Sequence, residues 1–212
     1  MINFIKKTKF NIKQYRWGRI FSRSILAGIM IGLAGLVNLS VDNKFVGALL
    51  FSFGLITILA QSLNLYTGKV GTINLSCEWF MLPVIIFGNF IGTNIIAWGM
   101  RFTRFGETLN QLAYVVVQNK LADNWFSILL LSIGCGIMMY LAVKGWTENT
   151  STWLIVILPV MIFILSGFEH SIANMFYFAM ANEYSIKTFL YVGLMLIGNA
   201  IGTLGFKKLK LV

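Results

Sequence analysis

Long uncharged apolar runs separated by short polar turns constrain this chain more than any other feature. Only 11% of its 212 residues are charged, whereas a soluble domain carries roughly 25%. A surface so poor in charge must face something other than water. The sequence therefore excludes a cytosolic domain, a disordered chain and a disulfide-stapled secreted domain. At about 20 residues for each helix that crosses a bilayer, the length accommodates six crossings and no second, soluble domain.

The apolar runs predict an all-α membrane protein with six transmembrane helices. The expected spans are 24–41, 45–63, 79–100, 125–143, 153–181 and 188–206. We expect a single integral membrane domain over 1–212. Its parts are a basic cytoplasmic N-terminus (1–23), a first three-helix repeat (24–100), an extracellular connection (101–124), a second three-helix repeat (125–206) and a cytoplasmic tail (207–212).

The basic residues predict the orientation of these spans. Of the 17 Lys and Arg, seven precede the first apolar run and Lys207, Lys208 and Lys210 follow the last. Because cytoplasmic segments are enriched in Lys and Arg, both chain ends are predicted on the cytoplasmic side of the cell membrane. No basic face interleaved with aromatic residues occurs, so the net charge of +10 does not indicate a nucleic-acid partner. Cys77 and Cys135 lie far apart beside apolar runs and are interpreted as packing residues.

Two spans are interrupted by polar residues. The second ends in the mixed stretch 64–72, and the fifth meets the polar stretch 166–174 near the bilayer centre. Backbone leaves a helix at that depth only where it is buried in protein or lines a cavity, because unpaired peptide groups in hydrocarbon cost several kcal/mol each. We therefore expect broken second and fifth helices around a cavity.

The sequence repeats itself in two halves. Gly-Asn-Phe-Ile-Gly-Thr at 88–93 returns as Gly-Asn-Ala-Ile-Gly-Thr at 198–203, and Gly-Ile-Met at 28–30 returns at 136–138. Because each half has an odd number of helices, the second half enters from the opposite face, giving a 3+3 inverted repeat. Interrupted segments at corresponding positions of such repeats indicate a transport site near the midplane.

His170 is the only histidine, and it stands beside Glu169 in the middle of the fifth span. Ionisable groups at that depth cost at least ~2.5 kcal/mol on insertion scales and are functional by default. Such an imidazole could donate a proton to a passing weak acid or a fixed hydrogen bond to an anion, and both roles stay open. Adjacent helical residues point about 100° apart, so Glu169 is expected to cap broken backbone or to face a subunit contact.

Other classes fit less well. One histidine cannot form a two-histidine metal helix, and no Gly-x-Ser-x-Gly motif is present, so we expect neither an enzyme nor a metal or cofactor. A water or small neutral solute channel shares the architecture, but the paired Asn-Pro-Ala loops are absent. Composition leaves a structural membrane protein open, although such a protein has no use for a polar break.

The stretch Ser-Gly-Phe-Glu-His-Ser-Ile-Ala-Asn-Met-Phe at 166–176, after Leu-Pro-Val at 158–160, resembles the fifth-helix signature of the formate/nitrite transporter family. Further matches lie at 51–55, 65–68, 88–89 and 198–199. The resemblance implies a homopentamer of aquaporin-like protomers in the lipid bilayer. Each protomer would have its own pore for a small monovalent anion.

The resemblance also implies roles for individual residues. The residues expected along the substrate pathway are Phe51, Leu55 and Phe163 in an outer apolar constriction, Leu65 and Tyr66 in an inner one, Thr67 hydrogen-bonded to His170, Lys120 in the outer vestibule, and Asn199 and Glu169. Four positions depart from the family pattern. Gly136 replaces an asparagine, so a polar group expected near the pore is missing. Asn64 stands where an acidic or similar polar residue often precedes the loop, Tyr66 replaces a phenylalanine, and Lys69 follows the loop. The tyrosine hydroxyl is expected to make the inner ring less dry, and Lys69 to add positive potential on the cytoplasmic side.

The expected function is a channel for small weak-acid anions, formate or nitrite first, with hydrosulfide, acetate and lactate as alternatives within the family. In the simplest mechanism Lys120 attracts the anion, which is protonated in the dry zone and crosses as the neutral acid. In the alternative, the anion itself passes and His170 is a hydrogen-bonding station. The sequence does not distinguish a channel from a proton-coupled carrier.

Overall fold

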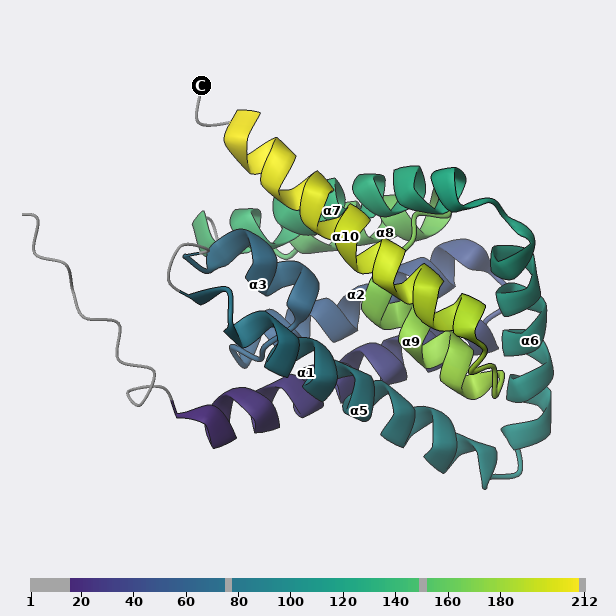
Figure 1. The fold of residues 1–212 in the computed structure, drawn as a ribbon. Coiled ribbons are helices and arrows are strands. Elements are labelled where there is room, and N and C mark those ends of the chain that lie inside the picture. The colour runs from purple at the N-terminus through teal and green to yellow at the C-terminus, as the bar shows by residue number, and fades with distance from the viewer. Residues whose placement is uncertain (1–15, 75–77, 149–151, 210–212) are drawn as a thin grey trace, which may run out of the picture.

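The computed structural model describes residues 16–74, 78–148 and 152–209, which form helices joined by short turns (Figure 1). Four of these helices are long and apolar enough to cross a membrane: α1 (Trp17–Ser40), α5 (Met81–Arg101), α7 (Trp125–Glu148) and α10 (Ile186–Leu209). They correspond to the first, third, fourth and sixth predicted spans. The described residues are therefore those of an all-helical protein with apolar spans.

Several helix ends differ from the predicted ones. α1 begins at Trp17 rather than Ser24, so part of the basic segment 1–23 is helical. α7 continues past Val143 to Glu148, and α10 takes up the first residues of the predicted tail. In each case charged residues at a span end had been assigned to a loop. Long basic side chains can lie along a helix and still reach water, so charge alone makes the predicted helices too short: α1 starts too late, and α7 and α10 end too early.

Both predicted breaks are present, at 61–65 and at 166–170. The first lies earlier than expected, because most of the stretch 64–72, where a continuous helix was not expected, is helical. The segments are α2 (Lys44–Ala60) and α3 (Tyr66–Thr72), then α8 (Leu154–Leu165) and α9 (Ser171–Met180). Both breaks use the same turn. Ser62 and Gly167 have positive φ angles of 52° and 69°. The next residue in each case, Leu63 or Phe168, donates its N–H to the carbonyl five residues back, at 2.8 and 2.9 Å. This is the Schellman ending of a helix.

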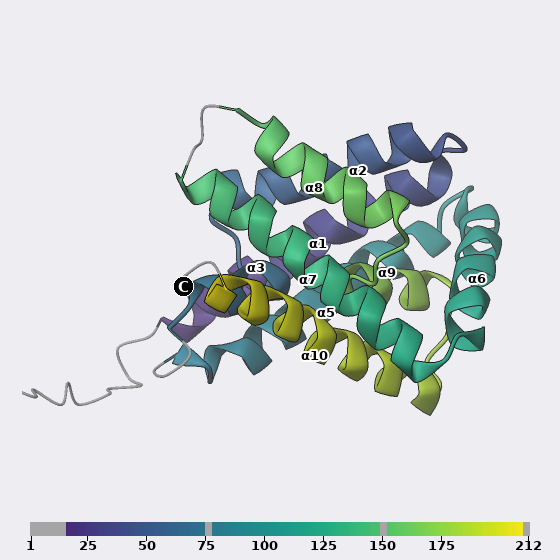
Figure 2. The same cartoon turned by 90° about the horizontal axis from the view of Figure 1, so that it is seen from above.

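The connection 101–124 is largely helical, which was not predicted. It contains α6 (Gly106–Ala122), which lies across the end of the bundle away from the start of α1 and the end of α10 (Figures 1 and 2). Leu109, Ala113 and Val117 are buried at four-residue spacing and hold one face of α6 against the bundle. We call the end covered by α6 the α6 end, and the opposite one the terminal end.

Closely packed glycines join the long helices in two equivalent pairs. A Cβ atom at Gly28 of α1 would overlap the backbone carbonyl of Asn89 on α5, and one at Gly136 of α7 would overlap that of Asn199 on α10. α1 therefore packs on α5 as α7 packs on α10. Gly136, interpreted from sequence as a missing polar group near the pore, is instead a helix contact with no room for an asparagine side chain.

Candidate functional site

The candidate site lies where the two broken segments meet. Thr67 is the second residue of α3, and His170 is the N-cap of α9. Their side chains are 2.9 Å apart, from Thr67 Oγ1 to His170 Nε2, and both are buried. Residues 103 positions apart in the sequence thus form one hydrogen bond between the half-helices.

Two asparagines hold the broken backbone in place. Asn89 accepts the Tyr66 N–H at 2.9 Å and donates to the carbonyls of Ser24 and Asn64, both at 2.8 Å. Asn199 makes the equivalent set in the other half: it accepts the Ser171 N–H at 3.0 Å and donates to the carbonyls of Ser132, at 2.9 Å, and Glu169, at 2.8 Å. Each side chain therefore satisfies two backbone groups that a helix break leaves without a partner, and ties the break to a carbonyl of α1 or α7.

Asn199 was among the predicted pathway residues, whereas its counterpart Asn89 was not. The repeated Gly-Asn-x-Ile-Gly-Thr motif was the signal that could have paired them. Both amides are 0% exposed and fully used by backbone, so they support the site without lining it.

The hydrogen bonds of His170 define its tautomer. Nδ1 accepts the Ala173 N–H at 3.0 Å, so in the neutral ring the proton is on Nε2, which donates to Thr67 Oγ1. Protonating Nδ1 would set two donors face to face at the N-terminus of α9, where the helix dipole also disfavours a cation. The structure therefore holds a neutral imidazole whose Nε2–H points across to α3. The sequence did not predict that His170 caps the N-terminus of α9.

Aromatic side chains cover the imidazole on one side. The Phe163 ring stacks on it with centroids 5.7 Å apart, and Phe51 meets Phe163 edge-on at 5.8 Å. Phe51 and Phe163, predicted to share one apolar constriction, are thus in contact. Leu55 lies one helical turn after Phe51 on α2 and is 1% exposed.

A cavity of about 370 Å³ opens at the terminal end and reaches Leu55 and Leu65. Leu65 was predicted in the inner constriction, and Leu55 in the outer one. Leu55 borders this cavity as well as following Phe51 on α2. It therefore lies between the cavity and the aromatic pair and is not confined to the outer constriction. His170 does not line this cavity and is 2% exposed, so apolar side chains close the path on that side.

Tyr66 does not take the place expected for it. Its hydroxyl donates to the Leu196 carbonyl on α10 at 2.9 Å, and its side chain faces α10 rather than the cavity that Leu65 lines. The expectation that this hydroxyl makes the inner ring wetter is therefore wrong. A tyrosine is accommodated because a carbonyl on the neighbouring helix satisfies its hydroxyl.

Lys120 and Glu169 form an ion pair between α6 and the second break. Lys120 Nζ lies 2.6 Å from Glu169 Oε2, and Asn174 donates to the same oxygen at 2.8 Å. We had expected Glu169 to cap broken backbone or to face a subunit contact. Its side chain is instead buried and pairs with side chains of α6 and α9. Its carboxylate neutralises the lysine predicted to attract anions. Beside this group, the Ser171 hydroxyl and Asn174 Oδ1 are buried without a hydrogen-bond partner among the described residues.

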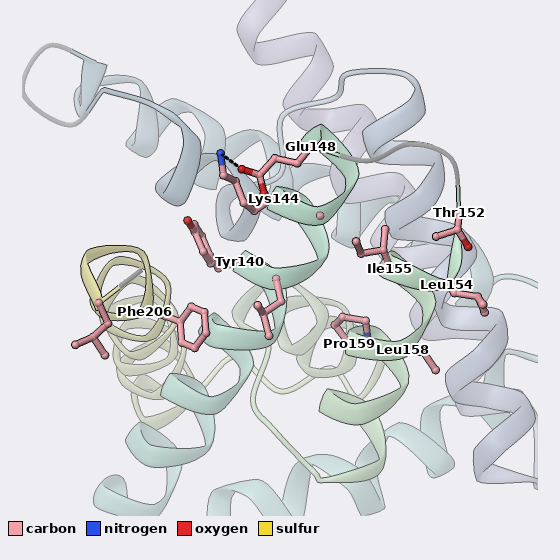
Figure 3. A pocket seen from close by; sticks show the side chains of 12 residues that line it. Tyr140, Lys144, Glu148, Thr152, Leu154, Ile155, Leu158, Pro159 and Phe206 are labelled. Atoms are coloured by element: carbon pink, nitrogen blue, oxygen red, sulfur yellow. Dashed lines mark ion pairs between the residues drawn. The ribbon is translucent and has the colours of Figure 1, made fainter. Parts of the chain in front are cut away.

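A larger cavity, of about 880 Å³, lies elsewhere, between α7, α8 and α10 (Figure 3). Its walls are mostly apolar, and the Lys144–Glu148 ion pair, at 3.0 Å, stands at one end. None of the predicted pathway residues lines it. It is a groove on the side of the bundle and contributes nothing to the candidate site.

Comparison with known proteins gives consistent results. The sequence profile of the Formate/nitrite transporter family matches residues 2–211. The formate channel FocA of Haemophilus influenzae is 32% identical over 186 residues, a match that covers 74% of this chain and 64% of that protein. FocA of Escherichia coli K12 is 29% identical over 188 residues, with the same shares. The chain thus spans a little under two thirds of the length of these relatives.

A solved structure shows the same fold. It is described as a pentameric formate channel with formate bound, and it matches with a TM-score of 0.77 at 26% identity. The match covers 92% of this chain and 96% of that one. Together with the apolar helices, these matches identify a membrane protein of a channel and transporter family.

Proposed function

Because the chain belongs to the formate/nitrite transporter family, we propose that it is a membrane channel for small monovalent weak-acid anions, formate or nitrite first. The relatives named as formate channels support formate. The observation that carries the proposal is the buried His170–Thr67 pair between the two breaks, next to the apolar residues at which the cavity from the terminal end stops.

We propose a six-span 3+3 inverted repeat, with α2 and α3 forming one broken span and α8 and α9 the other. The matched Schellman turns, asparagine contacts and glycine contacts support it. The terminal end is proposed to be cytoplasmic, because it carries Arg16, Arg19, Lys207 and Lys208. The pentameric relative supports a homopentamer.

His170 is proposed to act as a neutral hydrogen-bond donor. A neutral imidazole has no acidic proton to give at physiological pH, and the charged form would lose its bond from the Ala173 N–H. Its Nε2–H donates to the Thr67 oxygen, which leaves the hydroxyl hydrogen of Thr67 to bind a passing anion. The permeant then crosses the dry section as its conjugate acid, with the proton taken from water beside the constriction. The apolar side chains of the dry section would exclude the charged anion.

Substitution of His170 separates this role from that of a proton donor. His170→Gln keeps an N–H near the position of Nε2 but cannot titrate, whereas His170→Leu loses both properties. The measurement is formate flux into reconstituted vesicles between about pH 5 and about pH 8. We expect the glutamine variant to keep the pH profile of the wild type and the leucine variant to lose most of the flux.

A flattened pH profile in the glutamine variant would favour proton donation by the imidazole. His170→Asn is a control for folding, because asparagine is a good N-cap and can still accept the Ala173 N–H. A parallel flux panel with nitrite, hydrosulfide, acetate and lactate identifies the preferred anion. No flux of any of these anions through the wild type would overturn the proposed function itself.

A further inference from the structure

Two adjoining cavities form a vestibule at the terminal end. The one that reaches Leu65 is about 370 Å³ and is lined by Lys69. The other is about 450 Å³ and is lined by Lys207. The two cavities share wall residues from α3 and α7: Gly68, Thr72, Val143 and Thr147. Two lysines from different helices therefore flank one water-accessible entrance to the apolar constriction.

The charge of Lys69 is not neutralised by direct contact. Within 16–74, 78–148 and 152–209, its half-buried side chain makes no ion pair and no hydrogen bond. Arg23 and Glu78 are near enough to act on it electrostatically, with opposite signs. Lys207 donates one hydrogen bond, to the Gly71 carbonyl at 2.8 Å, and keeps its charge.

The other polar groups of the vestibule add no net charge. Lys144 is paired with Glu148 at 3.0 Å (Figure 3). Thr72 and Thr147 direct their hydroxyls to carbonyls of their own helices, Gly68 and Lys144 respectively. The two remaining ammonium groups therefore give the vestibule a positive potential, which low-dielectric walls focus toward the entrance.

The α6 end has the opposite arrangement. There Lys120 is neutralised by Glu169 at 2.6 Å. In α9 the position equivalent to Lys69, the fourth residue of the half-helix, is Asn174, which donates to Glu169. The lysine is thus present in only one of the two corresponding half-helices.

We propose that Lys69, assisted by Lys207, forms an anion-recruiting site for small monovalent anions at the terminal end. This inference rests on the proposed function and adds a location to it. The electrostatic assistance acts at the mouth of the terminal end, where salt on that side alone screens it. A single unpaired charge at a narrow mouth raises the local anion concentration roughly 3- to 10-fold at low ionic strength. The effect decreases as salt shortens the Debye length.

The test is formate flux in vesicles whose protein orientation is measured by protease cleavage of a C-terminal tag, with an impermeant salt added to one side at a time. Lys69→Gln should lower flux roughly 3- to 10-fold at low formate and low salt, and equally in both directions, because the permeability of a passive pore is the same in each. Salt on the terminal side should remove this difference from the wild type, salt on the α6 side should not, and flux at saturating formate should match the wild type. Lys69→Arg should retain the wild-type flux. Lys208→Gln is the matched control, because it removes the same charge from an exposed residue at the same end.

No loss of flux in a folded Lys69→Gln variant, or a loss that salt on either side removes equally, would overturn this inference while leaving the channel function intact. An equal effect of Lys208→Gln would also overturn it, because surface charge and not the vestibule would then be responsible. A wild-type protein that conducts none of the anions would instead overturn the proposed function, and this inference with it. Folding is checked by the size-exclusion profile of each variant, and the arginine variant supplies a second test.

Discussion

The chemistry of the candidate site depends on the hydrogen bond between His170 and Thr67. Thr67 Oγ1 accepts a hydrogen bond from His170 Nε2–H at 2.9 Å, and the Ala173 N–H donates to Nδ1 at 3.0 Å. Both ring nitrogens are thus committed, and the free hydrogen is that of the threonine hydroxyl. The threonine is therefore as important to the proposed site as the histidine.

Thr67→Val should test that importance. Valine keeps the shape of threonine but leaves Nε2–H buried without an acceptor, which costs roughly 1–3 kcal/mol. We expect a lower unfolding temperature in detergent and a formate flux reduced about tenfold or more. Thr67→Ser keeps the hydroxyl and should retain most of both properties. Full flux in the valine variant would show that the hydroxyl does not contact the permeant.

Sequence alone identified His170 and Thr67 as a pair only through the family resemblance, because residues so far apart share no periodicity. It could not predict what Tyr66 and Gly136 face. The residue type shows which chemical group is present but not what it contacts. Tyr66 binds the Leu196 carbonyl, and Gly136 packs against the Asn199 backbone. Both partners belong to another helix. The bond from the Ala173 N–H to His170 likewise depends on the residue at which α9 begins.

At the scale of helices, each break is stable because its free backbone groups have partners. α2 and α8 end in the same turn. Asn89 and Asn199 each accept one N–H from the chain that follows and donate to one of its carbonyls, and each donates once more to a long helix. Without these amides the backbone at the breaks would be unpaired in a dry interior.

Asn89→Leu and Asn199→Leu should therefore have similar effects. Each leaves two backbone groups at its break without a partner, at about 1 kcal/mol or more per group, and removes a hydrogen bond to α1 or α7. We expect thermal unfolding of the detergent-solubilised protein at clearly lower temperature and faster hydrogen exchange at Tyr66 or Ser171. Asn119→Leu, on the exposed face of α6, is the control and should change neither. A strong effect in only one half would contradict the equivalence of the two breaks.

The breaks were predictable because polar residues and glycines interrupt apolar runs at a depth where that is costly. The helix α6 was not, because its apolar positions form a narrow stripe among polar residues. A segment of that composition resembles a loop until the bundle end on which it packs is known. The short helix α3 was likewise hidden by its glycines and polar residues.

For the whole molecule, sequence predicted the four helices that are long and apolar enough to cross a membrane, and their order, since their length follows from the bilayer. How α6 connects to the site was not predictable. α6 reaches the second break through Lys120 and Glu169, whose side chains are 18% and 5% exposed. A helix at the end of the bundle is thereby coupled electrostatically to the centre. The charge of Lys120, which was predicted to attract anions in the outer vestibule, is instead paired with Glu169. Its effect on anions therefore depends on both residues.

A double-mutant cycle on this pair separates attraction of anions from neutralisation of Glu169. Lys120→Met alone leaves a buried carboxylate without its cation, which costs roughly 3–5 kcal/mol and repels anions. We therefore expect both lower stability and lower formate flux at low formate concentration. Glu169→Gln leaves a partly exposed ammonium, so it should destabilise less and should raise flux at low concentration, because the lysine is no longer neutralised.

The double variant, Lys120→Met with Glu169→Gln, gives the decisive comparison. Stability should recover in part, with a coupling energy of roughly 1–3 kcal/mol from thermal unfolding, because no buried charge is left unpaired. If Lys120 attracts anions, flux at low formate concentration stays below that of the wild type. If its only role is to neutralise Glu169, flux returns to the wild-type level, and attraction from the α6 end is contradicted. The structure favours a return to the wild-type level, since the ion pair has little net charge to offer a distant anion.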